Sequence, residues 1–263
     1  MKKLLGTLLA LLMVTALILS AACTVNYKEI TQEEFTYLND NIYNIKWPEY
    51  HYEMTYTLQS TDTELSNGIK SIKLTYLYKR IFLTETTAVV DEHAVIELTT
   101  TDASYKTEYW YLTSDMNNDN HYAYTRMTNG KESINIKCTV FELGTWVYYE
   151  PLEIWREQWQ MSANVFHQIA RRQFDNMFYS INNFISPAKP EKPIGKSGNN
   201  YKFTQSEKDT LEYYYFTLKD LQVTSMEMEQ TGVDGTITCN VKPSDKGVTL
   251  PDWTSDENAY YQM

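Results

Sequence analysis

The 263-residue chain has few of the residues that most often carry out chemistry, with three cysteines and four histidines. The histidines are far apart, and none has a partner at the spacing of a metal site. The Gly-x-Ser-x-Gly turn of serine hydrolases is also absent. The sequence therefore indicates no catalytic residue, no metal ligands and no cofactor, and we expect a protein that is not an enzyme.

Positive charge is scarce as well. The chain has 23 lysines and arginines against 34 aspartates and glutamates, which gives a formal net charge of −11. Nucleic-acid binding requires a basic surface, because the phosphate backbone supplies much of the affinity. The charge balance therefore argues against a nucleic-acid partner, and it argues equally against binding to anionic lipids by charge alone.

Long hydrophobic runs are confined to the first residues. The run from Leu4 to Leu19 contains no charged residue, but it is shorter than the roughly 20 apolar residues that span a bilayer. It follows "MKK" and precedes the small residues of "SAAC". A short basic region, an apolar core and a small-residue cleavage site are typical of an export signal, so residues 1–22 are predicted to be a signal peptide.

The end of this signal resembles that of bacterial lipoproteins, with "LSAAC" as the lipobox. Family signals usually have Leu three residues before the cysteine, whereas Ser20 stands there in this chain and Leu19 is one residue further back. The resemblance implies that Cys23 carries acyl chains such as palmitate. The domain would then be held at the extracytoplasmic side of a bacterial cell membrane, with the membrane as its partner through this lipid. The alternatives are a plain secretory signal and an uncleaved anchor.

Two further cysteines, Cys138 and Cys239, lie in stretches that alternate like strands. A disulfide between them is permitted outside the cytoplasm. Two buried free thiols are the alternative, because free cysteine is among the most buried residue types. The sequence leaves both possibilities open.

The hydrophobic period divides the mature chain into alternating segments. A tether at 23–30 precedes a helix that begins near Thr31. A period of two then predicts about seven strands over 50–149, and a period near 3.6 predicts a helical insertion at about 151–185, as one helix or as a pair with a break near Ser162. A loop at 186–200, four or five further strands and an acidic tail at 251–263 complete the chain.

The predicted fold is α+β and mainly antiparallel, with a single β-rich domain over 31–250. A sheet of about eleven strands is too large to stay flat, so we expect a curved sheet or half-barrel. The N-terminal helix and the central helix or helix pair must bury their apolar sides, and the concave face of the sheet offers the place for them.

Aromatic residues are the most prominent feature of the composition, with 22 tyrosines, 9 phenylalanines and 6 tryptophans. Trp155, Trp159 and Phe166 share one stripe of the central helix, and Tyr214 and Phe216 share one face of a strand. Tyrosine and tryptophan suit binding surfaces, because each combines an apolar ring with a polar group. Ordinary core packing is the alternative for every one of these side chains.

The order of elements resembles the periplasmic lipoprotein-carrier (LolA-like) half-barrel superfamily, in which a curved sheet and covering helices enclose an apolar cavity. This resemblance implies that the domain binds a lipid or another hydrophobic small molecule. Trp155, Trp159 and Phe166 would then line the cavity opposite Tyr214 and Phe216. The alternative is an envelope interaction protein that binds glycan or protein through exposed aromatics, without a cavity.

Overall fold

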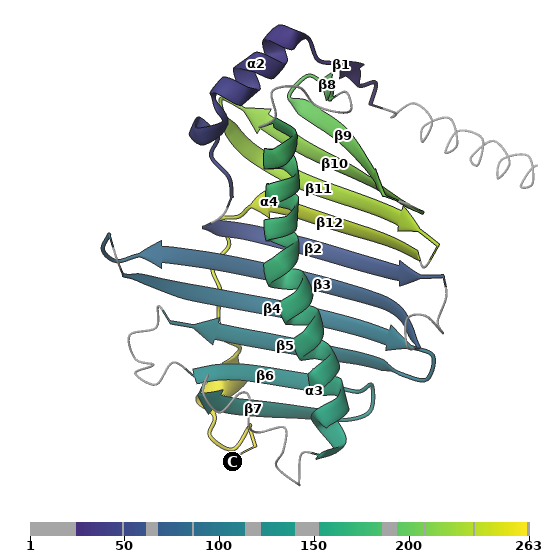
Figure 1. Ribbon diagram of the computed structural model, residues 1–263. Coiled ribbons are helices and arrows are strands. Elements are labelled where there is room, and N and C mark those ends of the chain that lie inside the picture. The colour runs from purple at the N-terminus through teal and green to yellow at the C-terminus, as the bar shows by residue number, and fades with distance from the viewer. Residues whose placement is uncertain are drawn as a thin grey trace, which may run out of the picture.

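The computed structural model places the strands of the chain in one sheet, with the long helix lying across one face (Figure 1). The described residues are 25–48, 50–61, 68–85, 87–113, 122–139, 153–185, 194–207, 209–233 and 235–261. Every pair of neighbouring strands in this sheet is antiparallel.

The sheet consists of two meanders and a short edge strand. The first meander is β2 (His51–Ser60), β3 (Ile69–Phe82), β4 (Ala88–Thr100), β5 (Ser104–Leu112), β6 (Tyr122–Thr128) and β7 (Ser133–Thr139). The second is β8 (Gly195–Ser197), β9 (Asn200–Glu207), β10 (Thr210–Lys219), β11 (Gln222–Gly232) and β12 (Gly235–Pro243), with β1 (Lys28–Glu29) beside β8. β12 pairs with β2, so the strand order is β1-β8-β9-β10-β11-β12-β2-β3-β4-β5-β6-β7.

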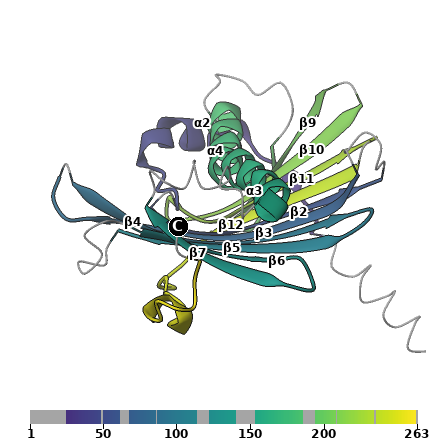
Figure 2. The same ribbon diagram turned by 90° about the horizontal axis from the view of Figure 1, so that it is seen from below.

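Figure 2 shows that the sheet is curved and that the helices lie on its concave side. The predicted fold class, α+β with a curved and mainly antiparallel sheet, is therefore confirmed. The described residues form twelve strands, close to the expected eleven. The last of the strands predicted over 50–149, in "TWVYYE", lies outside the described residues.

One continuous helix crosses the concave face of the sheet. It consists of α3 (Glu153–Val165), the π-helical segment η5 (Phe166–Arg171) and α4 (Arg172–Ile185). Of the two predicted arrangements, the single helix is the one observed. Its irregular part is the π-helical segment rather than a break at Ser162, which is buried and hydrogen-bonded to Thr107 (Oγ1 to Oγ, 2.8 Å). No described helix combines the length and the apolar composition that crossing a bilayer requires.

The N-terminal helix begins where the sequence predicts. α2 (Gln32–Asp40) starts after Thr31, whose side chain accepts from the backbone N–H of Glu34, while the Glu34 carboxylate accepts from the backbone N–H of Thr31. This capping box satisfies two donors that the first helical turn leaves unpaired. Phe35 and Leu38 are buried in the core, and the short helix η1 (Ile42–Asn44) follows α2.

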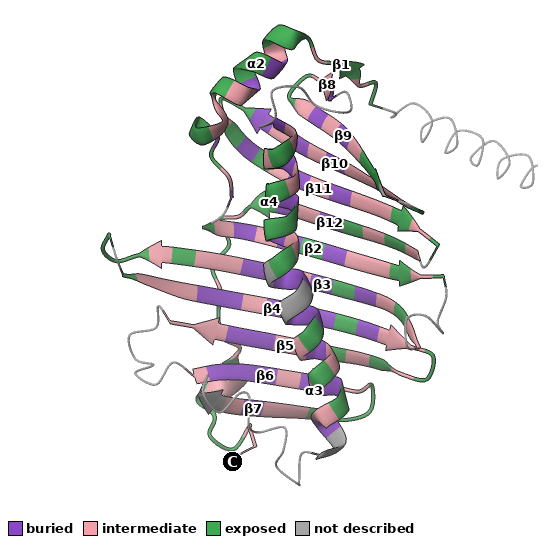
Figure 3. Ribbon diagram, viewed as in Figure 1, coloured by how far each residue is buried: buried purple, intermediate pink, exposed green. Residues whose placement is uncertain are grey.

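The core lies between the concave face and the long helix. In the middle of β2 and β3, buried positions alternate with partly or fully exposed ones, as Figure 3 shows. Met54 and Leu74 contribute fully buried side chains from the sheet, and Met177, Ile181 and Ile185 contribute them from α4. Fully burying such a side chain stabilises the fold by roughly 1.5–3 kcal/mol. The helix is therefore part of the core and holds the concave face together.

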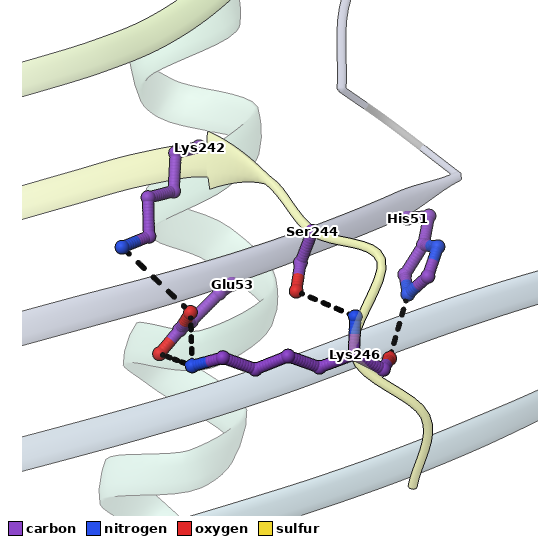
Figure 4. A network of polar contacts seen from close by, with 5 residues as sticks. All are labelled: His51, Glu53, Lys242, Ser244 and Lys246. Atoms are coloured by element: carbon purple, nitrogen blue, oxygen red, sulfur yellow. Dashed lines mark hydrogen bonds and ion pairs between the residues drawn. The ribbon is translucent and has the colours of Figure 1, made fainter.

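The C-terminal segment crosses the convex face, which Figure 2 shows on the side opposite the helices. It is fixed first to β2: the Nζ of Lys246 lies 2.8 and 3.0 Å from the carboxylate oxygens of Glu53, and the Nε2 of His51 donates to the carbonyl of Lys246 at 2.9 Å (Figure 4). Lys242 approaches the same carboxylate at 3.8 Å.

The far end of this segment covers aromatic side chains of β5 and β6. The Trp253 ring lies 5.9 Å from Trp110 and 6.1 Å from Tyr124, in edge-on contacts, and the Arg126 guanidinium lies 5.0 Å from it. Beyond Trp253, the side-chain amide of Asn135 donates to the carbonyl of Ala259 at 2.7 Å. The predicted acidic tail, at 251–263, is therefore packed along the sheet as far as Tyr261. The sequence could not indicate this, because the segment has no regular period.

His93 lies beneath this covered region, with its ring stacked on Trp110 at 5.0 Å. Its Nε2 and the Nε1 of Trp253 are buried, and neither has a hydrogen-bond partner in the described part of the chain. Burial lowers the pKa of His93; Glu108 opposes this shift and Lys106 adds to it.

We expect the free energy of unfolding to fall as the pH drops through the usual histidine value of 6.5. The unfolded chain then binds a proton at His93 that the folded chain does not, and this favours unfolding. His93→Phe keeps a ring on Trp110 but cannot titrate, so its stability should depend less on pH. Urea unfolding of both chains between pH 8 and pH 5 measures this, and equal pH dependence would contradict it.

Cys239 and Cys138 do not form the disulfide that the sequence left open. Cys239 is a free and fully buried thiol in β12, opposite Tyr56 of β2, whereas Cys138 lies in β7 at the far edge of the sheet. Six strand steps separate β12 from β7, and neighbouring strands are about 4.8 Å apart. A disulfide requires Cα atoms within about 7 Å, so the sheet keeps these two cysteines out of reach.

Burial raises the pKa of the Cys239 thiol to about 12. Because the thiolate is the reactive form, we expect Cys239 to resist iodoacetamide in the folded protein and to react once the chain is unfolded. Peptide mass mapping after alkylation at pH 8, with and without guanidinium, measures this in a Cys138→Ser chain. Rapid alkylation of Cys239 in the folded chain would contradict the expectation.

Two short segments are more ordered than the sequence suggests. The predicted tether at 23–30 includes β1, and the predicted loop at 186–200 includes β8 and the start of β9. Neither strand is long enough to produce a recognisable period, so the sequence could not reveal them. Cys23, the predicted lipidation site, lies outside the described residues.

Candidate functional site

A groove lined with tyrosines runs along one side of the long helix on the concave face. Its volume is about 480 Å³, within the usual range of small-molecule sites. We call it the tyrosine groove. Its lining consists of Tyr50, Tyr52, Tyr76, Tyr78, Arg80, Val90, Glu92, Tyr111, Phe174 and Asp175.

Strand register brings the centre of the groove together. Tyr52 of β2 lies opposite Tyr78 of β3, Tyr78 lies opposite Glu92 of β4, and Glu92 lies opposite Tyr111 of β5. Directly opposite residues of antiparallel strands point to the same face of the sheet. These four side chains therefore form one row across four strands, although they come from widely separated parts of the sequence.

Ring packing fixes the wall of the groove nearest the helix. Tyr52 stacks on Phe174 of α4 with ring centroids 4.6 Å apart and planes 9° from parallel, and it stacks on Tyr78 at 5.3 Å. Tyr76 meets Phe166 edge-on at 5.5 Å. Aromatic pairs of this kind contribute about 0.5–1.5 kcal/mol beyond simple burial. The wall is therefore held in place by the same contacts that attach the helix to the sheet.

A buried carboxylate lies at the centre of the groove. Glu92 is only 1% exposed, and the hydroxyl of Tyr76 donates to its Oε1 at 2.5 Å. A buried carboxylate requires such donors, because removal from water is costly. Arg80 and Asp175 supply the other charges of the groove, and neither forms an ion pair with a described residue. The groove thus combines aromatic rings with charges of both signs.

The outer rim of the groove exposes aromatic surface. Tyr50 and Phe82 meet edge-on at 5.2 Å, with 47% and 49% of their surface exposed. The Arg80 guanidinium lies 5.0 Å from the Phe82 ring, and the backbone N–H of Arg80 donates to the carbonyl of Tyr50 at 2.7 Å. Tyr50, just before β2, and the end of the β3–β4 hairpin therefore present two rings and a cation beside the entrance.

The aromatic residues singled out in the sequence are distributed along the whole helix and sheet. Trp155 packs with Met127 and Ile136, with Trp159 beside them, and Phe166 contacts Tyr76 and Tyr109. At the other end of the sheet, Tyr214 stacks on Phe203 at 4.9 Å and Phe216 stacks on Tyr201 at 4.9 Å.

These five side chains therefore do not face one another across a shared cavity. Trp155, Phe166, Tyr214 and Phe216 are at least 90% buried, and none of the five lines the tyrosine groove. The expectation that they lie opposite one another is wrong because the helix runs across the sheet, so its successive turns meet different strands. Core packing, the alternative reading, describes their observed surroundings.

The residues of the tyrosine groove carried a weaker signal. Tyr52 belongs to the alternating stretch "YHYEMTYTLQ", and Tyr76 and Tyr78 belong to "SIKLTYLYKRIF". Each shares one face of its stretch with apolar residues, and core packing is the simplest interpretation of such a face. Glu92 stands between Asp91 and His93 in β4, so nothing in the sequence distinguishes it from its polar neighbours. Only the register of β2 to β5 brings them together, and hairpin loops of differing length hide that register in the sequence.

Other depressions are similar in volume to the tyrosine groove or smaller. One of about 420 Å³ is lined by charged and polar side chains, among them Glu108 and Arg126, and one of about 460 Å³ lies beside Tyr27 and Lys202. A depression of about 280 Å³ on the opposite side of α4 is lined mostly by polar side chains, among them Asn176, Asn183, Glu212 and Gln230. In the part of the chain that the structure describes, no cluster of three or more His, Cys, Asp or Glu residues could hold a metal ion.

Comparison with protein-family models, curated proteins and solved structures finds no match for this chain.

Tyr76→Phe should reduce the free energy of unfolding by about 1–3 kcal/mol, because it removes a donor from the buried Glu92 carboxylate. Tyr37→Phe is the matched control, since Tyr37 is 54% exposed, and its effect should stay within about 0.5 kcal/mol. Chemical denaturation at pH 7 measures both. Equal stability of the two variants would show that this hydrogen bond does not support the groove.

Proposed function

We propose that this protein is a membrane-anchored bacterial lipoprotein whose extracytoplasmic domain binds a lipid or another largely hydrophobic ligand in the tyrosine groove. The protein acts by binding and not by catalysis. The row of Tyr52, Tyr78, Glu92 and Tyr111 carries this proposal, because it joins aromatic surface to a buried polar group within one groove.

The composition of the groove favours an amphipathic ligand. Small-molecule sites are mostly apolar and aromatic, with a few polar groups that fix orientation. The rings of Tyr78, Tyr111 and Phe174 would cover the apolar part of such a ligand, and Arg80, Glu92 and Asp175 would bind its polar part. The helix fills the middle of the concave face, so the ligand would lie beside the helix and not beneath it.

The anchor is supported by the sequence. "MKK", the apolar run and "LSAAC" precede a domain that starts within a few residues of Cys23. Two acyl chains hold a protein at a bilayer where one chain is only marginal. The order of elements also supports the likeness to the LolA-like half-barrels, whose members bind acyl chains.

Binding of glycan or protein through exposed aromatics is a second candidate. Tyr50 and Phe82 favour it, because both are about half exposed and lie beside Arg80 at the end of a hairpin. Such rings stack readily on sugars or on other side chains. This function would use the rim of the tyrosine groove, whereas a hydrophobic ligand would use its floor.

Native mass spectrometry of the mature domain with Cys23→Ser, purified from a bacterial host, tests the first candidate. We expect a co-purifying lipid-sized mass that organic extraction removes.

Tyr78→Ala should weaken binding of that ligand about tenfold, or about 1.4 kcal/mol, because it removes a ring from the groove floor.

Tyr43→Ala is the control for lost aromatic surface, because Tyr43 is 98% exposed and lies outside the groove. It should leave binding of the extracted ligand unchanged. Equal weakening by Tyr78→Ala and Tyr43→Ala would argue against the groove. A bare protein mass, together with glycan binding that Phe82→Ala abolishes, would favour the second candidate.

A further inference from the structure

The first described residues are built into the edge of the sheet. Lys28 and Glu29 form β1, which pairs with Lys196 and Gly195 of β8. The backbone N–H of Ile30 then donates to the carbonyl of Ile194 at 2.9 Å. A segment that contributes ladder hydrogen bonds has a fixed position relative to the sheet, unlike a flexible linker.

Side chains reinforce this attachment. The Glu34 carboxylate, which caps α2, also lies 2.8 Å from the Nζ of Lys196 in β8. On the convex face, the Tyr27 ring lies 6.1 Å from Tyr215 and 5.9 Å from the Nζ of Lys202. Tyr27 therefore packs against β9 and β10 on the convex face.

Gly195 leaves room for the side chain of Tyr27. A Cβ at position 195 would lie 2.9 Å from the Cβ of Tyr27, closer than real side chains approach. The absence of a side chain there lets the N-terminal segment lie directly against β8. The contacts of Tyr27 thus begin four residues after Cys23, and four extended residues span at most about 14 Å.

We propose that the β1–β8–β9 edge of the sheet is a docking surface for the lipid bilayer, so that the domain stands on this edge in a fixed orientation. This inference rests on the proposed lipid anchor at Cys23. A span of about 14 Å leaves the edge no room to move far from the membrane.

The charge distribution agrees with this orientation. Lys28, Lys196 and Lys202 lie on the anchored edge. The acids there are Glu29 of β1, Glu207 of β9, and Glu33 and the Lys196-paired Glu34 of α2. The whole chain, in contrast, has a net charge of −11. Anionic lipids attract lysines near the surface and repel an acidic body. With three lysines and four acids the edge is close to neutral, so charge opposes its contact with anionic lipids far less than it would for an evenly acidic surface.

The orientation determines where the tyrosine groove lies. β2, the first groove strand, is five strand steps from β8, which is roughly 25 Å along the sheet. β7 lies ten steps from β8, at the membrane-distal edge. A ligand of the groove therefore binds clear of the headgroups, and it must leave the bilayer or project from it.

Energy transfer in vesicles tests the orientation with the full lipidated chain. A donor dye is attached through a bioorthogonal amino acid at Asn199, in the β8–β9 turn, or at Lys131, in the β6–β7 turn; both residues are exposed. The acceptor is a headgroup-labelled lipid in phosphatidylcholine vesicles containing phosphatidylglycerol. We expect several-fold more transfer from position 199 than from position 131. Equal transfer, or more from position 131, overturns the proposal.

A chain with 20 flexible Gly and Ser residues inserted after Thr24 is the control. It keeps the anchor and the fold but releases the edge, so the difference between the two positions should shrink. An unchanged difference would show that the edge binds lipid without needing the short connection, which also supports the docking surface.

Flotation of the full lipidated chain with the vesicles is measured first. A chain that does not float overturns both the anchor and the orientation, whereas a floating chain with equal transfer overturns the orientation alone.

Discussion

The attachment of one helix to the concave face is the contact on which the rest of this structure depends. A twelve-stranded antiparallel sheet exposes an apolar face that it cannot cover by itself. The helix of 153–185 supplies that cover, with Met177, Ile181 and Ile185 fully buried along α4. It also holds the two meanders together, because its two ends pack on different meanders while β12 and β2 join them at the centre.

The same helix decides what kind of site the concave face can offer. Its side chains occupy the middle of the curved sheet, where the sequence suggested a cavity. The strands β2 to β5 extend beyond the helix on both sides (Figure 1). The tyrosine groove lies on one of these sides, where Phe174 and Asp175 of the helix meet the strands. Phe174 and Asp175 belong to the helix and also line the groove, so a movement of the helix would change the groove directly. Binding there and stability of the core are therefore coupled.

The sequence predicts features set by local periodicity and misses those set by register. The strand alternation, the helix start near Thr31 and the long helical stripe follow from spacings within a few residues. The row of Tyr52, Tyr78, Glu92 and Tyr111 depends on how three hairpins align, and its residues look like ordinary core one strand at a time. β1 and the C-terminal segment escaped prediction because each is held by tertiary contacts alone.

The two terminal segments of the described chain each cover aromatic side chains on the convex face. Most of this face is polar, but aromatic side chains gather at both ends of the sheet: Tyr213 and Tyr215 on β10, and Trp110 and Tyr124 on β5 and β6. Tyr27 packs on Tyr215 and Trp253 covers Trp110 and Tyr124, so each terminal segment shields one aromatic patch from water. β10 has the core on one side and the N-terminal segment on the other. The sequence of this strand, "LEYYYFTL", is therefore apolar on both faces. A lipid at Cys23 would thus be joined to a part of the fold that the sheet already holds in place, and the anchor would transmit its position to the whole domain.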